Sequence, residues 1–329
     1  PAASNKAGLE PHKVMHDNIM GTYASTTFWC SEEEAVAADH AVMDVFNAIN
    51  ARFSTWIDDS EMIRLNASAA KEPFVCSDSM WELLSHARRA YDVSDGGFDI
   101  SAGPLMKLWG FYRRRKTLPS QEEIDKAKAK VGLNKVVFDE EKKTVFFTVE
   151  GMALDSGGIV KGWALDLAAQ KVQAMGVSRG LIDLGGNILV LSEPPPERKA
   201  YRIAIRDPRH QGQYTQSLGI VETTGRAIST SGDYERFVDI DGTRYSHIMD
   251  PRTGKPVTGI AAVSVLAPSG VVSDFLSTTI FVNQGQGMDE LLKEFNNLSI
   301  ALVRMDENGK LSLETYGPGL EDIKESPAW

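Results

Sequence analysis

The sequence predicts an α+β protein built on antiparallel sheet, and three observations carry that prediction. Runs that favour strands and runs that favour helices do not alternate regularly along the chain, which argues against repeated βαβ units. The second half consists mostly of short strand-like runs separated by glycine, proline and aspartate. Two pairs of runs are joined by hairpin signals, a charged tip at 140–143 and an Asn-Gly turn at 307–310.

Local patterns place the elements of the first half in order. Residues Asn18 to Phe28 alternate as in a strand, and Ser31-Glu-Glu-Glu34 supplies a capping box for the helix that follows. Gly157 and Gly158 form a turn after a short strand, and Gly176 closes the helix that begins after this turn. Further helices are predicted at 78–93, from 120 onward and at 160–175, and strands at 135–139, 144–149 and 152–155.

The second half continues with strands and ends with helices and a hairpin. Strands are predicted at 180–183, 188–192, 201–206, 218–223, 237–241, 261–267, 300–304 and 311–315, and helices at 272–282 and 288–295. At 329 residues the chain has room for about two domains or one large one. We expect a flexible segment at 1–17, one domain at 18–315 with a soft subdomain boundary near Gly151, and a tail at 316–329.

Composition narrows the class of protein. Thirty-five basic against 45 acidic residues give a net charge of −10, which disfavours nucleic acid and anionic membranes as general partners. Cys30 and Cys76 lack the spacing of a zinc or iron–sulfur site and are either one disulfide or two buried thiols. No apolar run approaches the length of a membrane-spanning helix. The small, polar, unpatterned residues after Pro1 lead us to expect an exported protein.

The segment Asp155-Ser-Gly-Gly-Ile-Val-Lys-Gly162 is the most informative for chemistry. Its glycines allow close approach of a ligand, and the helix N-terminus and Lys161 would attract an anion such as a phosphate. It matches neither a Walker A loop nor a Rossmann fingerprint. A plain glycine turn with a solvated lysine would explain the same residues.

Asp274 and Thr278 stand four residues apart in a predicted helix, so their oxygens project from one face. Together with a backbone carbonyl from a glycine turn they could hold a magnesium ion. Alternatively, Asp274 is simply an acid that the helix dipole stabilises near the helix N-terminus, and the Thr278 hydroxyl hydrogen-bonds to the backbone of its own helix.

Three other segments combine polar groups with turns or aromatic residues. His247 stands in a Pro- and Gly-containing turn and could act as an acid, a base or a phosphate donor, or simply stabilise that turn. Asp99 lies near Trp109 and Phe111, where aromatic groups and one acceptor could hold a planar heterocycle, although core packing explains the aromatics as well. The glycine-containing runs 183–187 and 229–233 could each approach a ligand or turn between strands, and a turn is the favoured prediction.

Taken together and in this order, the segments resemble the ApbE family of FAD:protein FMN transferases from about Met20 to about Val282. The shared motifs are Met20-Gly-Thr22, Phe53-Ser-Thr-Trp56, Ser60-Glu61, Arg64-Leu-Asn66, Gly97-Phe-Asp-Ile100, Pro104-Leu105, Leu108-Trp-Gly-Phe111, Asp155 to Gly162, Asp183-Leu-Gly-Gly-Asn187, Ser246-His-Ile-Met-Asp-Pro251, and Asp274 with Thr278. Two departures are mild: Trp56 replaces a more usual tyrosine, and Gly158 stands where alanine or threonine is common. The latter leaves a backbone carbonyl unaffected.

The resemblance implies a bilobal α+β fold, with antiparallel sheets flanked by helices, that binds FAD in a cleft between subdomains and uses Mg²⁺ at its diphosphate. The implied reaction joins FMN through a phosphoester to a Thr or Ser hydroxyl of a partner protein and releases AMP. The implied metal ligands are the Gly158 carbonyl, Asp274 and Thr278. The residues implied to line the FAD site are Met20, Trp56, Gly97, Phe98, Asp99, Asp155, Lys161, His247 and Ile248.

Within that set, Asp155, Lys161 and His247 are the expected catalytic residues, and Asp155 and His247 both remain candidates for the base. The resemblance further implies a periplasmic enzyme that flavinylates a redox subunit of a membrane electron-transfer complex. Two other functions use the same residues: a Mg²⁺-dependent FAD pyrophosphatase that gives FMN and AMP, and a non-catalytic FAD carrier or assembly factor.

Overall fold

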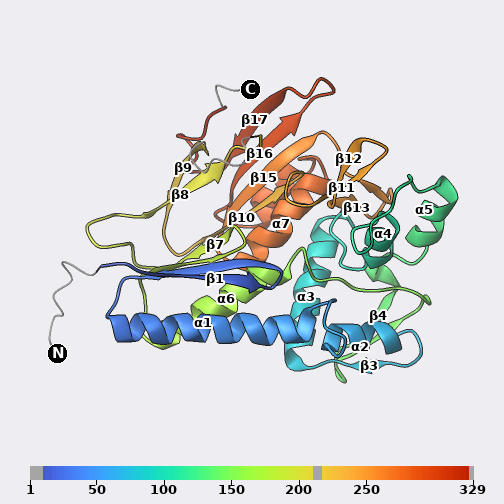
Figure 1. Ribbon diagram of the computed structural model, residues 1–329, viewed down its shortest axis with the longest axis horizontal. Coiled ribbons are helices and arrows are strands. Elements are labelled where there is room, and N and C mark those ends of the chain that lie inside the picture. Colours follow the sequence, from blue (N-terminus) through green and yellow to red (C-terminus); the bar gives the residue numbers. More distant parts are fainter. Residues whose placement is uncertain (1–9, 210–216, 326–329) are drawn as a thin grey trace.

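The computed structural model describes residues 10–209 and 217–325 of the protein (Figure 1). The helices are α1 (Glu32–Phe53), α2 (Glu61–Ser68), α3 (Asp78–Val93), α4 (Gly103–Leu108), α5 (Gln121–Lys128), α6 (Val160–Ala174), α7 (Gly270–Val282) and α8 (Met288–Glu294), with a 3-10 turn at Leu133–Lys135. The strands are β1 (His12–Ile19), β2 (Thr22–Phe28), β3 (Phe74–Val75), β4 (Val136–Asp139), β5 (Thr144–Phe147), β6 (Gly180–Leu184), β7 (Asn187–Val190), β8 (Tyr201–Arg206), β9 (Ser217–Thr223), β10 (Ala227–Gly232), β11 (Phe237–Ile240), β12 (Thr243–Ser246), β13 (Met249–Asp250), β14 (Lys255–Pro256), β15 (Ile260–Ala267), β16 (Ser299–Met305) and β17 (Leu311–Tyr316).

One large sheet organises the molecule. Its eight strands follow the order β1-β2-β6-β7-β10-β15-β16-β17, and each neighbouring pair is antiparallel. Helices α1, α6 and α7 pack against it, and α7 makes its closest contacts with β10 and β15 (Figure 1). The predicted α+β class with antiparallel sheet is therefore confirmed.

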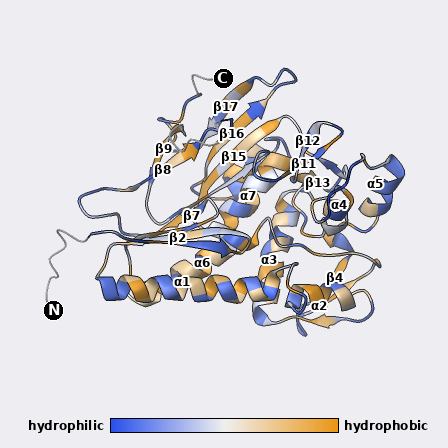
Figure 2. Ribbon diagram, in the orientation of Figure 1, coloured by the Kyte–Doolittle hydropathy of each residue, from blue (hydrophilic) through white to orange (hydrophobic). Residues whose placement is uncertain are grey.

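The central strands β15 and β16 are buried on both faces of the sheet, as the alternation of side chains along β16 shows. Ile300 and Leu302 belong to the core beneath α6 and α7, whereas Ala301 and Val303 face a second core. The β8–β9 hairpin covers this second core. In Figure 2 the hydrophobic colour follows β15 and β16, while α1 alternates between hydrophilic and hydrophobic residues. Central strands need apolar residues on both sides, whereas an outer helix needs them on one.

A second group of elements lies to the right of the sheet in Figure 1. It contains α3, α4 and α5, the small sheet β3-β5-β4, and the β11–β12 and β13–β14 hairpins. A third core joins α4 and α5 to the hairpins through Leu105, Trp109, Ile124, Ile240 and Met249. The predicted site residues Gly97, Phe98 and Asp99, between α3 and α4, and His247 and Ile248, between β12 and β13, belong to this group.

The N-terminal strand prediction was only partly right. Instead of one strand from Asn18 to Phe28, the structure has a hairpin in which β1 pairs with β2. The turn is made by Met20 and Gly21, whose φ angles are +50° and +76°. Residues 12–17 thus lie in β1 and not in a flexible segment, while residues 1–9 lie outside the described residues. Residues 152–155, also predicted as a strand, form only an isolated bridge between Ala153 and Ala102.

The prediction of a turn at 229–233 was wrong, because β10 runs through Ser229 to Gly232 in the middle of the sheet. Small polar residues normally indicate a turn, but here their hydroxyls serve packing. Ser229 Oγ lies 2.8 Å from Ser273 Oγ, and Ser231 Oγ lies 2.8 Å from Ser277 Oγ, both on α7. Short hydroxyl side chains let the helix approach the sheet and satisfy one another there. The other predicted turn, at 183–187, is confirmed by Gly185 and Gly186, with φ of +62° and +89° between β6 and β7.

The described structure also bears on the cysteines, the C-terminus and the membrane. Cys30 and Cys76 are free thiols, and burial, followed by the charge of Glu61, raises the pKa of Cys76 to about 12.

Leu320 and Ile323, within the predicted tail, are buried in the second core. Across the two described stretches, no helix combines the length and the apolar character needed to cross a bilayer.

Two glycines set the contact between α6 and α7. A Cβ at Gly162 would lie 2.1 Å from the Gly270 carbonyl oxygen, and a Cβ at Gly270 would lie 2.3 Å from the Gly162 oxygen. Both obstacles are backbone atoms, so neither can move aside as a side chain would. Any larger residue must therefore push the two helices apart.

We expect Gly162→Ala to lower the free energy of unfolding by about 3 kcal/mol, because the added methyl overpacks a backbone contact. Gly176→Ala is the matched control: it follows the same helix at φ +90° with nothing within 4 Å of its Cβ. It should cost only about 1 kcal/mol, from the left-handed backbone. Urea unfolding of both variants checks this, and equal losses would contradict the role assigned to the contact.

Candidate active site at the meeting of two helix N-termini

The N-terminal ends of α6 and α7 exchange hydrogen bonds through two carboxylates, the buried Asp274 and the half-buried Asp166. The Gly162 N–H, in the first turn of α6, donates to Asp274 Oδ2 on α7 at 2.8 Å. In return, the N–H groups of Gly270 and Val271 donate to Asp166 Oδ1 and Oδ2 on α6 at 2.6 and 2.9 Å. Each helix N-terminus, with its free donors and positive dipole end, is thus capped by an acid on the other helix.

Asp274 is the acid that faces the predicted site. It is only 5% exposed, and burial raises the pKa of its carboxyl group. The charge of Lys161, the Gly162 N–H and the Asn187 side chain act in the opposite direction. The carboxylate is therefore buried with one nearby cationic side chain, and a second positive charge would stabilise it further.

Thr278 and Gly158 lie next to one another near Asp274. Thr278 stands one turn after Asp274 on α7, and its Oγ1 is 3.2 Å from Ser231 Oγ. A Cβ at Gly158 would lie 3.9 Å from Thr278 Oγ1 and 3.1 Å from the ring of Phe98. A residue larger than glycine would therefore crowd this corner.

The donors in this corner suit a hard cation. A carboxylate, a hydroxyl and a backbone carbonyl are oxygen ligands of the kind that Mg²⁺ binds. Within the described residues there is no group of three or more His, Cys, Asp or Glu side chains that could hold a metal. The predicted ligands thus fit magnesium and do not form a zinc-type cluster.

Asp155 is held in its turn by backbone and side-chain bonds. Its N–H donates to the Ile100 oxygen at 2.7 Å, and its Oδ1 accepts from the Gly157 N–H at 2.8 Å. Its Oδ2 accepts from the hydroxyl of Tyr112 in a short hydrogen bond. Both carboxylate oxygens of Asp155 therefore already have donors.

Tyr112 is a site residue that the sequence analysis missed. Its ring packs edge-on against Trp56 with 5.8 Å between centroids, and burial together with the charge of Asp155 raises its pKa. Trp56 itself is 66% exposed, so one large aromatic surface next to Asp155 is open to a ligand. The only signal in the sequence was that Tyr112 directly follows the aromatic run at 108–111.

His247 is neutral at physiological pH. Its Nδ1 lies 3.0 Å from the Arg236 carbonyl oxygen, which can only accept, so Nδ1 carries the proton and Nε2 is the basic nitrogen. Burial, then the charges of Arg236 and Lys161, lower its pKa to about 4. A histidine of this kind can take up a proton at Nε2.

Three other predicted residues, Gly97, Phe98 and Asp99, make contacts that hold the fold together. Phe98 is buried beside Phe275, with 6.3 Å between ring centroids, and Gly97 leaves space for Asn283. Asp99 accepts from the N–H groups of Ser101 and Leu133 at 2.8 and 3.2 Å, so its carboxylate is committed to the backbone.

Met20 and Ile248 contribute to the main core. The contacts thus join Trp56 to Asp155 through Tyr112. The positive charge of Lys161 acts to lower the pKa of both His247 and Asp274, but no contact joins these two residues among the described residues. The contacts provide no such link to Met20, Asp99 or Ile248, whose predicted roles in FAD binding stay predictions.

Two cavities lie beside this group rather than in it. One, of about 410 Å³, is lined by Asp166, Trp163 and Ser269 among others. The other, of about 470 Å³, is lined by Asn283, Arg252 and Asp95 among others. None of the predicted site residues lines either cavity.

The low pKa of His247 predicts a stability difference with pH. Its folded value of about 4 lies below the ordinary 6.5, so the unfolded chain binds more protons between these limits. Protonation therefore favours unfolding, and the stability associated with neutral His247 is lost as the pH falls from 6.5 toward 4.

We expect wild type to lose more stability across this window than His247→Gln, which cannot titrate. Urea unfolding of both proteins at the two ends of the window measures the difference. Parallel losses in the two proteins would show that His247 is not buried as described.

Comparison with known proteins gives a consistent result. Residues 20–302 match the model of the ApbE family. The chain is 31% identical to the FAD:protein FMN transferase of Vibrio cholerae over 264 residues, which cover 79% of this chain and 77% of that protein. It is 31% identical to the FAD:protein FMN transferase of Escherichia coli K12 over 280 residues, covering 82% and 78%.

Solved structures agree as well. The ApbE protein of Thermotoga maritima superposes with a TM-score of 0.82 at 28% identity and covers 92% of this chain and 96% of its own. The apo form of the Pseudomonas stutzeri flavinyl transferase ApbE gives a TM-score of 0.82 at 28% identity, with 96% and 98% covered.

Proposed function

The chain belongs to the ApbE family and is an FAD:protein FMN transferase, and we propose that it works with Mg²⁺ on a Thr or Ser hydroxyl of a partner redox protein. The observation that carries the proposal is the buried Asp274 carboxylate, which accepts from the Gly162 N–H at the N-terminal end of α6 and is stabilised by the charge of Lys161. A buried acid beside a helix N-terminus and a cationic side chain suits phosphoryl transfer from a diphosphate, for which the neutral His247 is a candidate base.

In the proposed reaction the acceptor hydroxyl oxygen bonds to the phosphorus of the FMN half of FAD. The P–O bond to the AMP half breaks, AMP leaves with that oxygen, and the hydroxyl proton passes to a base. Asp274, Thr278 and the Gly158 carbonyl would hold the metal, which when bound neutralises charge on the diphosphate.

The chain's own residues would divide the remaining work. Lys161, at the start of α6, offers its charge to the diphosphate together with the helix dipole. Trp56 offers an exposed ring for the flavin to stack on. Of the two candidate bases, His247 is favoured, because its Nε2 is unprotonated, whereas both oxygens of Asp155 already accept hydrogen bonds.

The acceptor partner and the place of action rest on the family alone. We propose as partner a flavin-bearing subunit of a membrane electron-transfer complex, and the periplasm as the compartment. Cell fractionation with detection of the protein tests the compartment, and recovery mainly with cytoplasmic markers would contradict it.

Replacing Asp274 by Asn should reduce FMN transfer by about 10² to 10³, because the proposed metal loses its one charged ligand and with it the charge that would stabilise the diphosphate. The amide oxygen can still accept from Gly162, so the fold should survive. Asp166→Asn is the matched control, since it alters the half-buried acid that caps the other helix of the same pair. We expect it to lower the melting temperature to a similar degree but to reduce transfer less than tenfold. Equal losses of transfer would place both acids in structure alone.

A labelling experiment tests the proposed reaction itself. A peptide with an Asp followed within a few residues by Ser/Thr, Gly/Ala and Ser/Thr should gain the mass of FMN minus water when mixed with the enzyme, FAD and Mg²⁺. The same peptide with Ala in place of its acceptor Thr is the control and should stay unlabelled. A docked hydroxyl outcompetes water because proximity supplies about 7 to 11 kcal/mol of the barrier. AMP and free FMN without labelled peptide would instead support the pyrophosphatase function.

A further inference from the structure

Four consecutive basic residues, Arg113 to Lys116, follow directly after the site residue Tyr112. They stand out in a chain whose net charge is −10. Arg113, Arg114 and Lys116 are exposed, and within the two described stretches none of them forms an ion pair. Three unpaired positive charges thus lie on one short loop beside the site.

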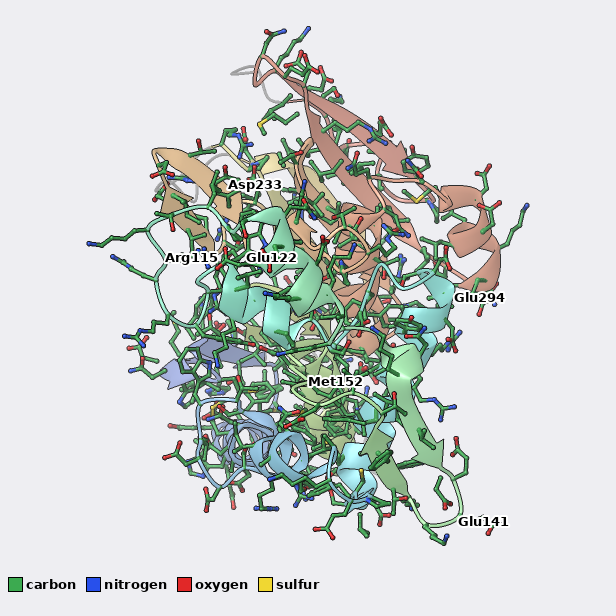
Figure 3. All side chains as sticks on the ribbon, turned by 90° about the vertical axis from the view of Figure 1, so that its right-hand side faces the viewer. Arg115, Glu122, Glu141, Met152, Asp233 and Glu294 are labelled. Carbon is green, nitrogen blue, oxygen red and sulfur yellow. The ribbon has the colours of Figure 1, made fainter. Side chains whose placement is uncertain are left out.

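The fourth residue, Arg115, holds the loop in place. Its guanidinium donates two hydrogen bonds to Glu123 on α5, at 3.0 and 2.8 Å, and its Nε donates to the Thr117 oxygen at 2.7 Å. The loop also folds back on Gly110, at φ +90°, where a Cβ would lie 2.8 Å from the Arg115 nitrogen. In Figure 3 Arg115 lies on the face turned to the viewer, and side chains with nitrogen tips extend from its loop into solvent.

The other end of the loop is fixed to the site. Tyr112 donates to Asp155 and packs against the exposed ring of Trp56. Arg236, also exposed, adds positive charge near Tyr112 and His247. The free charges of the loop are therefore held at the edge of the site rather than on a distant surface.

We infer that the loop 113–116 is a docking surface for an acidic segment of the acceptor protein, an inference that rests on the proposed function. Charge complementarity at the edge of a site speeds encounter and selects partners, although each exposed pair adds little affinity. Most of the enzyme repels an acidic partner because of its net charge, so a local basic surface would direct such a partner to the site. Arg115 would position the loop, and the three free residues would contact the partner.

The test uses the full chain and two fluorescent peptides with the same central acceptor pattern, one flanked by Glu and one by Gln. The loop variant is Arg113→Gln, Arg114→Gln and Lys116→Gln, which leaves Arg115 intact. The control variant is Lys171→Gln, Arg198→Gln and Lys199→Gln, which removes the same charge from exposed positions. Residues 198 and 199 precede β8, at the opposite end of the molecule from α4 and α5 (Figure 1).

Fluorescence anisotropy gives the affinities. We expect wild type to bind the Glu-flanked peptide roughly tenfold more tightly than the Gln-flanked one at low ionic strength. The preference should shrink at about 1 M salt, where the screening length is about 3 Å. The loop variant should lose the preference, and the control variant should keep it.

Four results would overturn the inference. Two concern wild type: equal affinity for the two peptides, or no measurable binding of the Glu-flanked peptide. The third is an equal loss of the preference for the Glu-flanked peptide in the control variant. The fourth is a weaker FAD affinity of the loop variant in a flavin fluorescence titration. The last would assign the loop to FAD. Mass spectrometry of the same mixtures with FAD and Mg²⁺ reports on transfer separately. A wild type that binds with the expected preference but labels neither peptide would thus count against the proposed function alone.

Discussion

The close crossing of α6 and α7 is the constraint on which the site depends. Gly162 and Gly270 let the two backbones meet, and this contact brings each helix N-terminus within reach of an acid on the other helix. A longer separation would leave the N–H groups of both first turns without these partners and would move Asp274 away from Lys161. The electrostatics of the site therefore depend directly on the packing of the two helices at Gly162 and Gly270.

The same arrangement concentrates charge where water is excluded. Burial raises the pKa of Asp166 to about 6 and raises that of Asp274, and the charges of the two acids oppose each other. Lys161 and the helix ends offset part of this cost. A bound cation would stabilise the ionised form of these acids. The oxygen atoms of Asp274, Thr278 and the Gly158 carbonyl are ligands of the kind that such a cation prefers. His247, kept neutral by burial and nearby positive charge, completes the set.

Much of the fold could be predicted from local signals. The capping boxes at Ser31 and Ser120 fixed the starts of α1 and α5, and the pattern at 78–93 matched α3 from end to end. Strand β10 was missed because its serines have low strand propensity, and only their pairing with α7 explains them. The β1–β2 turn was missed because Met20 adopts a positive φ, which a non-glycine residue rarely signals.

By itself, the sequence determined which chemical groups are present and in what order, and through them the family and the metal-ligand candidates. Asp274 and Thr278 share one face of their helix whatever the tertiary structure, because residues four apart in a helix lie on the same side. Only the tertiary structure decided that Tyr112 donates to Asp155, that the Asp99 carboxylate accepts from backbone amides, and that burial keeps His247 neutral. Those outcomes depend on burial and on partners distant in sequence, and neither is encoded in the spacing of nearby residues.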